Sequence, residues 1–153
     1  MRAGIRLGLD LGDVRIGVAR SDPAGMLAVP VEVIPAGPGA LSRIAEIVVE
    51  YEPIEVLLGL PIGLSGREGP AAIKVREFAA RLVPVIADTP VRLVDERLST
   101  VTAARAMRAA GTSSAKGRGR VDAAAAAVIV QTALEAERST GRPAGIAVEA
   151  ESR

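Results

Sequence analysis

The N-terminal third of the chain consists of short apolar runs separated by turn residues, a pattern that is typical of β-strands. We expect strands over residues 4–11, 15–20 and 27–34, because each run has the length of a strand and turn residues bound it. The connections, Gly12 to Val14 and a Pro-Ala-Gly turn, are short. These three strands are therefore predicted to form an antiparallel meander.

The rest of the chain alternates helical periodicity with apolar runs. Residues 39–52 carry apolar side chains at helical spacing, and Pro53 marks the end of this helix. The apolar run at 54–61 is of the kind that is buried on both faces of a parallel sheet. The remaining predicted elements are a helix at 70–86, a strand at 90–96, a helix from Ser99 to about residue 110, an irregular loop at 111–120 and an alanine-rich helix from Val121 to about Arg138.

This order of elements predicts an α/β fold with one mixed sheet. Three antiparallel strands followed by right-handed crossovers to two parallel strands give a five-stranded sheet with helices on both faces. That is the topology of the ribonuclease H-like fold. We expect a single domain over residues 1–138 and a flexible C-terminal tail over residues 139–153, which contain Gly141 and Pro143.

The residue types exclude several kinds of chemistry. The chain has 153 residues but no cysteine and no histidine, which excludes disulfides, thiolate metal sites and the Ser-His-Asp arrangement. Catalysis would have to use carboxylates, hydroxyls, lysine or arginine. The apolar runs are shorter than the roughly 18 residues of a membrane helix, and the N-terminus lacks a signal-peptide pattern. We therefore expect a cytoplasmic protein that does not enter a membrane.

A basic segment stands out against an otherwise acidic chain. The net charge is only +1, but residues 97–120 hold six basic side chains and no acidic one, which leaves 13 basic against 18 acidic residues elsewhere. Such a segment favours contact with a polyanion. The alternative interpretation is a helix face and a basic loop that contact only solvent. Because Tyr51 and Phe78 are the only aromatic residues, contact with backbone phosphates is favoured over stacking on bases.

Asp10 lies inside the apolar run of the first predicted strand. Side chains alternate along a strand, so Asp10 shares a face with Gly8 and Gly12, and this leaves open space around its carboxylate. A buried carboxylate is costly unless it is paired or binds a metal ion. The pattern fits either a metal ligand or an aspartate that caps a glycine-rich turn.

Four stretches of the sequence together resemble one known family. They are GLDLGDVRIGVA near the N-terminus, VLLGLPIGLSG at the fourth strand, DERLSTVTAAR at the fifth strand and KGRGRVDAAAAAVIV further on. In this combination, over residues 4–138, they closely resemble the YqgF/RuvX family of ribonuclease H-like proteins. The resemblance implies a hydrolase that processes the 5′ end of pre-16S ribosomal RNA or, in older usage, a Holliday junction resolvase.

The resemblance also implies a site in which Asp10, Glu96 and Asp122 are the catalytic and metal-binding residues. Two-metal hydrolysis of a phosphodiester needs a few carboxylates that hold Mg²⁺ or Mn²⁺, and it needs no histidine. Strand alternation places Asp95 and Glu96 on opposite faces, and we expect Glu96 to face the site. Asp122 also has a structural explanation, because a carboxylate near a helix N-terminus is stabilised by the helix dipole.

The fourth strand departs from the pattern of the wider fold. That fold usually takes its second carboxylate from this strand, which here ends in Gly59-Leu60-Pro61. Glu96 would therefore have to reach in from one strand further away. The Gly-Leu-Pro segment offers either a backbone surface that a nucleic-acid strand can approach closely or simply a tight turn.

Several basic residues are predicted to contact nucleic acid. Arg15 and Arg97 follow the elements that carry the acids, where each could hold a phosphate or neutralise a neighbouring acid. Lys116, Arg118 and Arg120 lie among glycines and are predicted to form a mobile basic loop that becomes ordered on the nucleic acid. The expected partner is structured RNA or branched DNA, and the expected state of the chain is a monomer or a homodimer.

Three other functions remain open from the sequence. A Holliday junction resolvase or DNA nuclease would use the same carboxylates, because contacts to phosphates carry no information about the bases. The first strand and its Asp-x-Gly turn also resemble the phosphate site of an ATP-binding lobe, although the chain is too short for the two lobes that enclose a nucleotide. A non-catalytic RNA-binding protein would keep the fold with a weak metal site.

Overall fold

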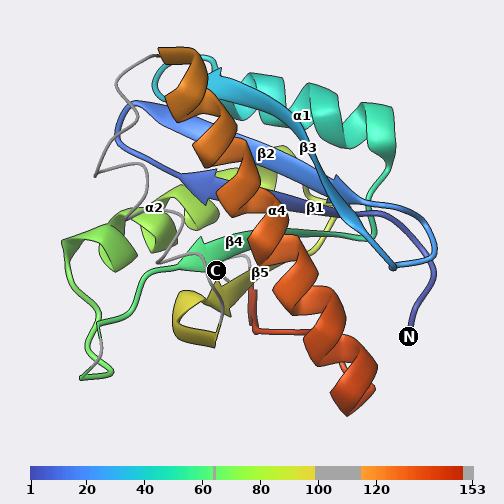
Figure 1. Ribbon diagram of the computed structural model, residues 1–153. Helices are drawn as coiled ribbons and strands as arrows, with labels where there is room; N and C mark the ends of the chain where they lie inside the picture. The colour runs from blue at the N-terminus through green and yellow to red at the C-terminus, as the bar shows by residue number, and fades with distance from the viewer. Residues whose placement is uncertain (64, 99–114, 150–153) are drawn as a thin grey trace.

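The protein forms one mixed sheet with helices on both faces. The computed structural model describes residues 1–63, 65–98 and 115–149, with the backbone alone for residues 98 and 115–122. Figure 1 shows helix α4 crossing one face of the sheet while helices α1 and α2 lie on the other face. The strands are β1 (Arg6–Leu11), β2 (Arg15–Ser21), β3 (Ala28–Pro35), β4 (Glu55–Leu60), β5 (Val91–Asp95) and β6 (Ile146–Val148). The helices are α1 (Ala40–Tyr51), α2 (Pro70–Val85) and α4 (Ala115–Thr140), with a short 3₁₀ turn, η1, at Glu96–Leu98.

The order of the strands confirms the predicted α/β topology. The sheet runs β3-β2-β1-β4-β5-β6. Strands β1, β2 and β3 form an antiparallel meander, and β1, β4 and β5 are parallel to one another. β4 therefore lies between β1 and β5, the two strands that lead to Asp10 and Glu96.

The number of strands differs from the prediction, since the described residues form a sheet of six strands and not five. The sixth strand, β6, lies inside the predicted C-terminal tail and pairs antiparallel to β5, with Val91 opposite Val148. Three residues are too few to show an alternating pattern, and backbone hydrogen bonds to the edge of β5 hold them in place. Sequence periodicity therefore could not reveal this strand.

Helix α4 begins earlier than predicted. Lys116, Arg118 and Arg120 lie in its first turns, whereas the sequence predicted an irregular loop at 111–120. Gly117 and Gly119 lower helix propensity, which is why the segment resembles a loop. Extending an existing helix costs much less than nucleating one, so the alanine-rich segment that follows can carry the helix through both glycines. The helix predicted from Ser99 to about residue 110 lies outside the described residues.

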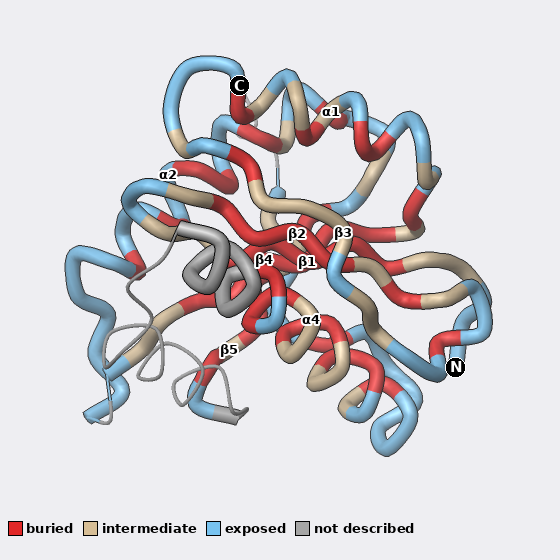
Figure 2. The backbone as a smooth tube through the Cα atoms, turned by 45° about the horizontal axis from the view of Figure 1, so that its top comes forward, coloured by how far each residue is buried: buried red, intermediate tan, exposed pale blue. Residues whose placement is uncertain are grey.

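Strand alternation divides the apolar side chains between two cores. Leu9 and Leu58 pack beneath α1 and α2, whereas Leu57 packs beneath α4. Gly8 allows α4 to approach β1 closely, because a Cβ atom there would lie 3.0 Å from the backbone oxygen of Ala126. Figure 2 shows burial concentrated in the central strands and on the sides of the helices that face them.

No helix in the described part of the chain is long and apolar enough to cross a membrane.

A buried ion cluster fixes the C-terminal part of α4 to the sheet. Arg6 of β1 and Glu137 of α4 are both buried, and their side chains form an ion pair of 2.9 Å. Arg2 bonds to Glu137 at 2.6 Å and also pairs with Glu55 of β4. Hydrogen bonds from Arg2, together with those from Arg6, lower the pKa of Glu137 from 4.5 to about 2. The cluster therefore joins the N-terminus, β1, β4 and α4 while the carboxylate is ionised.

We expect the substitution Glu137→Gln to lower the free energy of unfolding at pH 7 by about 3 kcal/mol, because it leaves the buried Arg6 without its partner carboxylate. The measurement is urea unfolding followed by circular dichroism. Glu135→Gln, at an exposed position of the same helix, is the control and should change stability by less than about 0.5 kcal/mol.

The same carboxylate should make stability depend on pH. The pKa of Glu137 is depressed in the folded state, so its contribution is complete above about pH 4.5 and is lost as the pH falls toward 2. The difference in unfolding free energy between the wild-type protein and Glu137→Gln should shrink over this interval. A difference that stays constant from pH 6 down to the acid transition would contradict the role of the ion cluster.

Candidate active site

Asp10 lies near the end of β1, on the face of the sheet that α4 covers. It pairs with Gly17 of β2, and its side chain is only 1% exposed. Gly8 faces α4, as its contact with Ala126 shows, and Asp10 follows two positions later on the same face. The carboxylate that stands between two glycines is thus buried, on the face of the sheet that α4 covers.

Glu96 directly follows β5 and is also buried, at 4% exposure. Its carboxylate lies over Gly59 of β4, because a Cβ atom at Gly59 would be 2.5 Å from Glu96 Oε1. The same Cβ atom would be 2.7 Å from Ile129 Cδ1 of α4, so this is the face that α4 covers. Glu96 therefore reaches across β4 in the direction of β1.

The register of the sheet brings the two acids to one place. Leu58 of β4 pairs with Leu9 of β1, so the next residue on each strand, Gly59 and Asp10, are neighbours on the opposite face. Asp10 from β1 and the carboxylate of Glu96 from β5 thus approach Gly59 from its two sides. The two acids are 86 positions apart in the sequence, and the parallel strands unite them.

Asp95 takes a different position from Glu96. It pairs with Leu60, whose side chain belongs to the core beneath α1 and α2. Its carboxylate forms an ion pair of 2.7 Å with Arg97, and this hydrogen-bonded contact lowers the pKa of Asp95 and raises that of Arg97. Glu96, and not Asp95, therefore shares a face with Asp10, in agreement with strand alternation.

The surroundings of the two buried acids fit a hard divalent cation. Asp10 Oδ2 and Glu96 Oε1 are buried and accept no hydrogen bond, although each side chain makes other interactions. Burying two like charges side by side is unfavourable unless a positive charge offsets it. Carboxylate oxygens are the ligands that Mg²⁺ and Mn²⁺ prefer. Asp10 and Glu96 could therefore hold such an ion, although the described side chains contain no cluster of three or more potential ligands.

The third predicted ligand, Asp122, belongs to α4, but its side chain lies outside the described residues. The backbone of α4 runs antiparallel to β1, because Glu137 meets Arg6 whereas Ala126 meets Gly8. Residue 122 is about one helical turn before residue 126. The turn that contains it therefore lies toward the end of β1 that carries Asp10.

The predicted nucleic-acid-binding residues have different positions. Arg97 is exposed and neutralises Asp95, the second of the two roles expected for it. Arg15 begins β2, and its carbonyl oxygen accepts a hydrogen bond of 2.9 Å from the backbone of Gly12, which closes the turn after β1. The side chains of Lys116, Arg118 and Arg120 lie outside the described residues.

The sequence did not show what Gly59 accommodates. Gly59 lies within β4 and is buried, so the group that approaches its backbone is the carboxylate of Glu96 and not an external strand of nucleic acid. The signal in the sequence was a glycine inside an apolar strand, which marks a close approach. It does not say which group approaches.

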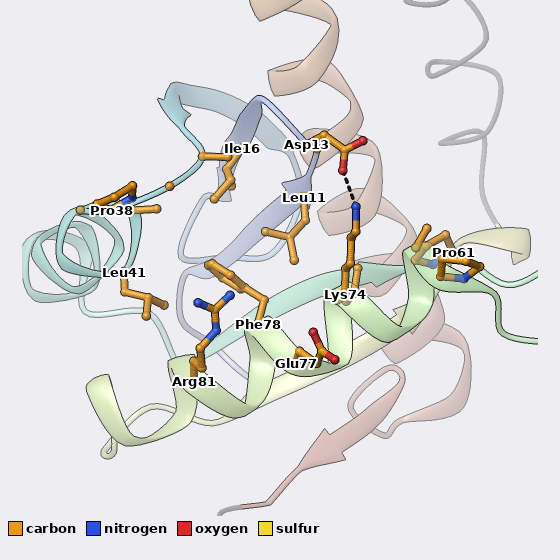
Figure 3. Close-up of a pocket in the computed structure, with 18 of the residues that line it drawn as sticks. Leu11, Asp13, Ile16, Pro38, Leu41, Pro61, Lys74, Glu77, Phe78 and Arg81 are labelled. Atoms are coloured by element: carbon orange, nitrogen blue, oxygen red, sulfur yellow. Dashed lines mark hydrogen bonds and ion pairs between the residues drawn. The ribbon is translucent and has the colours of Figure 1, made fainter.

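A separate cavity of about 1160 Å³ lies on the other face of the sheet, between α1, α2 and the turn after β1. Figure 3 shows Leu11, Leu41 and Phe78 among its apolar lining residues, and the ion pair between Lys74 and Asp13 above them. Leu11 is one position beyond Asp10, and its side chain packs in the core beneath α1 and α2. The cavity and the acid pair therefore lie on opposite sides of the sheet.

We expect Asp10→Asn to fold normally and, in the presence of a chelator, to raise the free energy of unfolding by about 1 kcal/mol, since it removes one of two neighbouring buried charges. Urea unfolding with EDTA measures this change. Asp95→Asn, which removes only an exposed ion pair, is the control and should lower stability by less than about 1 kcal/mol. A clear loss of stability in Asp10→Asn would favour the alternative role of Asp10 as a turn cap.

Comparisons with known proteins show which family the chain is related to. A family model named RuvX and described as Holliday junction resolvase matches residues 4–136. A protein of Streptomyces avermitilis named "Putative pre-16S rRNA nuclease" is 57% identical over 151 residues, which are 97% of each chain. A protein of Thermobifida fusca with the same name is 52% identical over 156 aligned positions, covering 97% of this chain and 98% of that protein.

A solved structure supports the fold independently. The Thermus thermophilus RuvC protein, in a structure described as a complex with a Holliday junction substrate, is similar to 91% of this chain and 98% of its own, with a TM-score of 0.57 and 20% identity. At that level of identity the likeness concerns the fold alone. Since the family model spans most of the sequence and the relatives align over nearly their whole length, the chain belongs to the RuvX family.

Proposed function

We propose that the protein is a metal-dependent nuclease in which Asp10, Glu96 and Asp122 hold Mg²⁺ or Mn²⁺ and a phosphodiester bond is hydrolysed. The observation that carries this proposal is the meeting of two buried carboxylates, from β1 and from the end of β5, around Gly59. Burying two carboxylates close together is unfavourable unless positive charge offsets it, and carboxylate oxygens are the ligands that Mg²⁺ and Mn²⁺ prefer.

In this proposal the three carboxylates bind the metal ions. Divalent ions held there would supply an activated water and would stabilise negative charge on the leaving oxygen. Asp10 on β1 and Glu96 just after β5 would fix the position of the ions, and the burial of both carboxylates would strengthen their electrostatic interaction with the ions. Asp122 would complete the ligand set from the first half of α4.

We further propose that the substrate is structured RNA and that the reaction belongs to the processing of the 5′ end of pre-16S ribosomal RNA in the cytoplasm. The names of the relatives from Streptomyces avermitilis and Thermobifida fusca support this substrate. The positive segment over residues 97–120 supports contact with a nucleic-acid backbone. The oligomeric state proposed is a monomer or a homodimer.

A second candidate is a Holliday junction resolvase or another DNA nuclease that uses the same carboxylates. The description of the matching family and the junction-bound RuvC structure favour it. Because phosphate contacts do not distinguish RNA from DNA, the same site would serve both reactions. A non-catalytic RNA-binding protein is the remaining alternative.

Cleavage assays separate these functions. The purified chain is incubated with precursor 16S RNA, single-stranded DNA and a four-way DNA junction, each with Mg²⁺, Mn²⁺ or EDTA. We expect metal-dependent cleavage of the RNA, and we expect Asp10→Asn to reduce the rate at least about 100-fold while the fold is retained. Asp95→Asn is the matched control and should cleave at a rate near that of the wild-type protein. Cleavage in EDTA, or by Asp10→Asn at the wild-type rate, would contradict the proposed chemistry.

The positive segment can be tested by the salt dependence of binding. Replacing Lys116, Arg118 and Arg120 with alanine should weaken RNA binding and reduce the slope of log K against log salt by about one unit for each lost phosphate contact. Fluorescence anisotropy at several salt concentrations measures the slope. Arg142→Ala, at an exposed position beyond α4, is the control. An unchanged slope in the triple variant would mean that these charges contact only solvent.

A further inference from the structure

Gly59 interrupts a strand that is otherwise ideal for the centre of a sheet. β4 has the sequence EVLLGL and is buried along its whole length. A glycine in such a strand contributes no packing and weakens the strand. Gly59 pairs regularly with Val94 of β5, and it is not among the described residues with positive φ. Its backbone conformation is therefore open to alanine, and the requirement for glycine must come from space.

The space that a side chain would occupy at Gly59 is filled by Glu96. A Cβ atom at this position would lie 2.5 Å from Glu96 Oε1 and 3.2 Å from Glu96 Cδ. The carboxylate thus takes the place of a β4 side chain, although Glu96 belongs to the end of β5. In this way an acid from the more distant strand reaches the position beside Asp10.

We propose that Gly59 is a positioning residue of the metal site, because its missing side chain lets the carboxylate of Glu96 cross β4. This inference rests on the proposed function, in which Glu96 is a metal ligand. Gly59 itself contacts neither metal nor substrate in this proposal. It acts through the location of Glu96.

The distances indicate how large the effect of a methyl group would be. To restore the 3.4 Å of an ordinary contact, Glu96 Oε1 would have to move by about 0.9 Å from its 2.5 Å position. A site of fixed geometry tolerates displacements of only about 0.5 Å. Alanine at position 59 should therefore displace the carboxylate beyond the range in which it can ligate the same ion as Asp10.

The neighbours of Gly59 also suggest that an alanine variant would fold. The two groups that the new methyl would meet, Glu96 Oε1 and Ile129 Cδ1, are the ends of flexible side chains. Gly8 is different, since a Cβ atom there would be 3.0 Å from the backbone oxygen of Ala126 and would push α4 away from the sheet. Gly59→Ala is therefore a test of side-chain placement rather than of folding.

The experiment measures Mn²⁺ binding to the full chain by isothermal titration calorimetry, together with thermal unfolding without metal. We expect Gly59→Ala to unfold near the wild-type temperature and to bind Mn²⁺ at least about tenfold more weakly, in the same direction as Glu96→Gln. Gly59→Ala combined with Ile129→Val removes the second close contact, because valine has no Cδ1 atom. Its Mn²⁺ affinity should stay low, and Ile129→Val alone should bind as the wild-type protein does.

A relocated carboxylate provides a second measurement that does not depend on Gly59→Ala folding well. In Gly59→Asp combined with Glu96→Ala, the acid comes from β4 itself and occupies the space that Glu96 has left. This double variant should bind Mn²⁺ more tightly than Glu96→Ala alone. Equal affinities of the two variants would count against the proposal.

The outcomes distinguish this inference from the proposed function. If Glu96→Gln binds Mn²⁺ as tightly as the wild-type protein, the ligand role of Glu96 fails, and the positioning role of Gly59 fails with it. If Glu96→Gln binds weakly while Gly59→Ala binds normally, only the role of Gly59 is wrong. If Ile129→Val restores binding to Gly59→Ala, the loss came from packing against α4, and the role of Gly59 is again wrong.

Discussion

The close packing of α4 on the sheet is the constraint on which the rest of the structure depends. At Gly8 the helix backbone approaches β1 so closely that a Cβ atom would lie 3.0 Å from a helix carbonyl oxygen. This approach buries the side of the sheet on which Asp10 and Glu96 lie. A helix held further away would leave both carboxylates in water, where their charges would be screened and would bind a cation weakly.

The charged side chains near the two ends of α4 form two different kinds of cluster. Near its C-terminus, Glu137 is buried with Arg6 and Arg2, so every charge has an opposite partner. Toward the other end, the helix lies over the face of the sheet that carries the buried carboxylates of Asp10 in β1 and Glu96 just after β5. The first cluster can fix the helix because it is balanced within the chain. The second brings together two buried carboxylates, whose oxygens are ligands that a divalent cation prefers.

The sequence predicted most of the fold because the central strands and helices have long, regular patterns. It failed where local pattern and tertiary context disagree. β6 is held by backbone pairing to β5 and has no periodicity of its own, and the first turns of α4 contain Gly117 and Gly119. For the site, alternation correctly placed Glu96 on the face of Asp10 and Asp95 on the other face. The cavity between α1, α2 and the turn after β1 could not be predicted, because residues from several distant segments line it.

Glu96 can reach over β4 because β4 and β5 are neighbours in the sheet. No single segment of the sequence contains this information. In a parallel sheet, neighbouring strands present side chains to the same face at the same level, so three adjacent strands offer three places for one carboxylate. Here the acid comes from β5 but its oxygens lie over β4, at the one level where β4 has a glycine. What a site of this kind requires is a carboxylate at a point in space beside Asp10. A short acid on β4, or a longer one just beyond β5 that reaches over a glycine of β4, can meet that requirement.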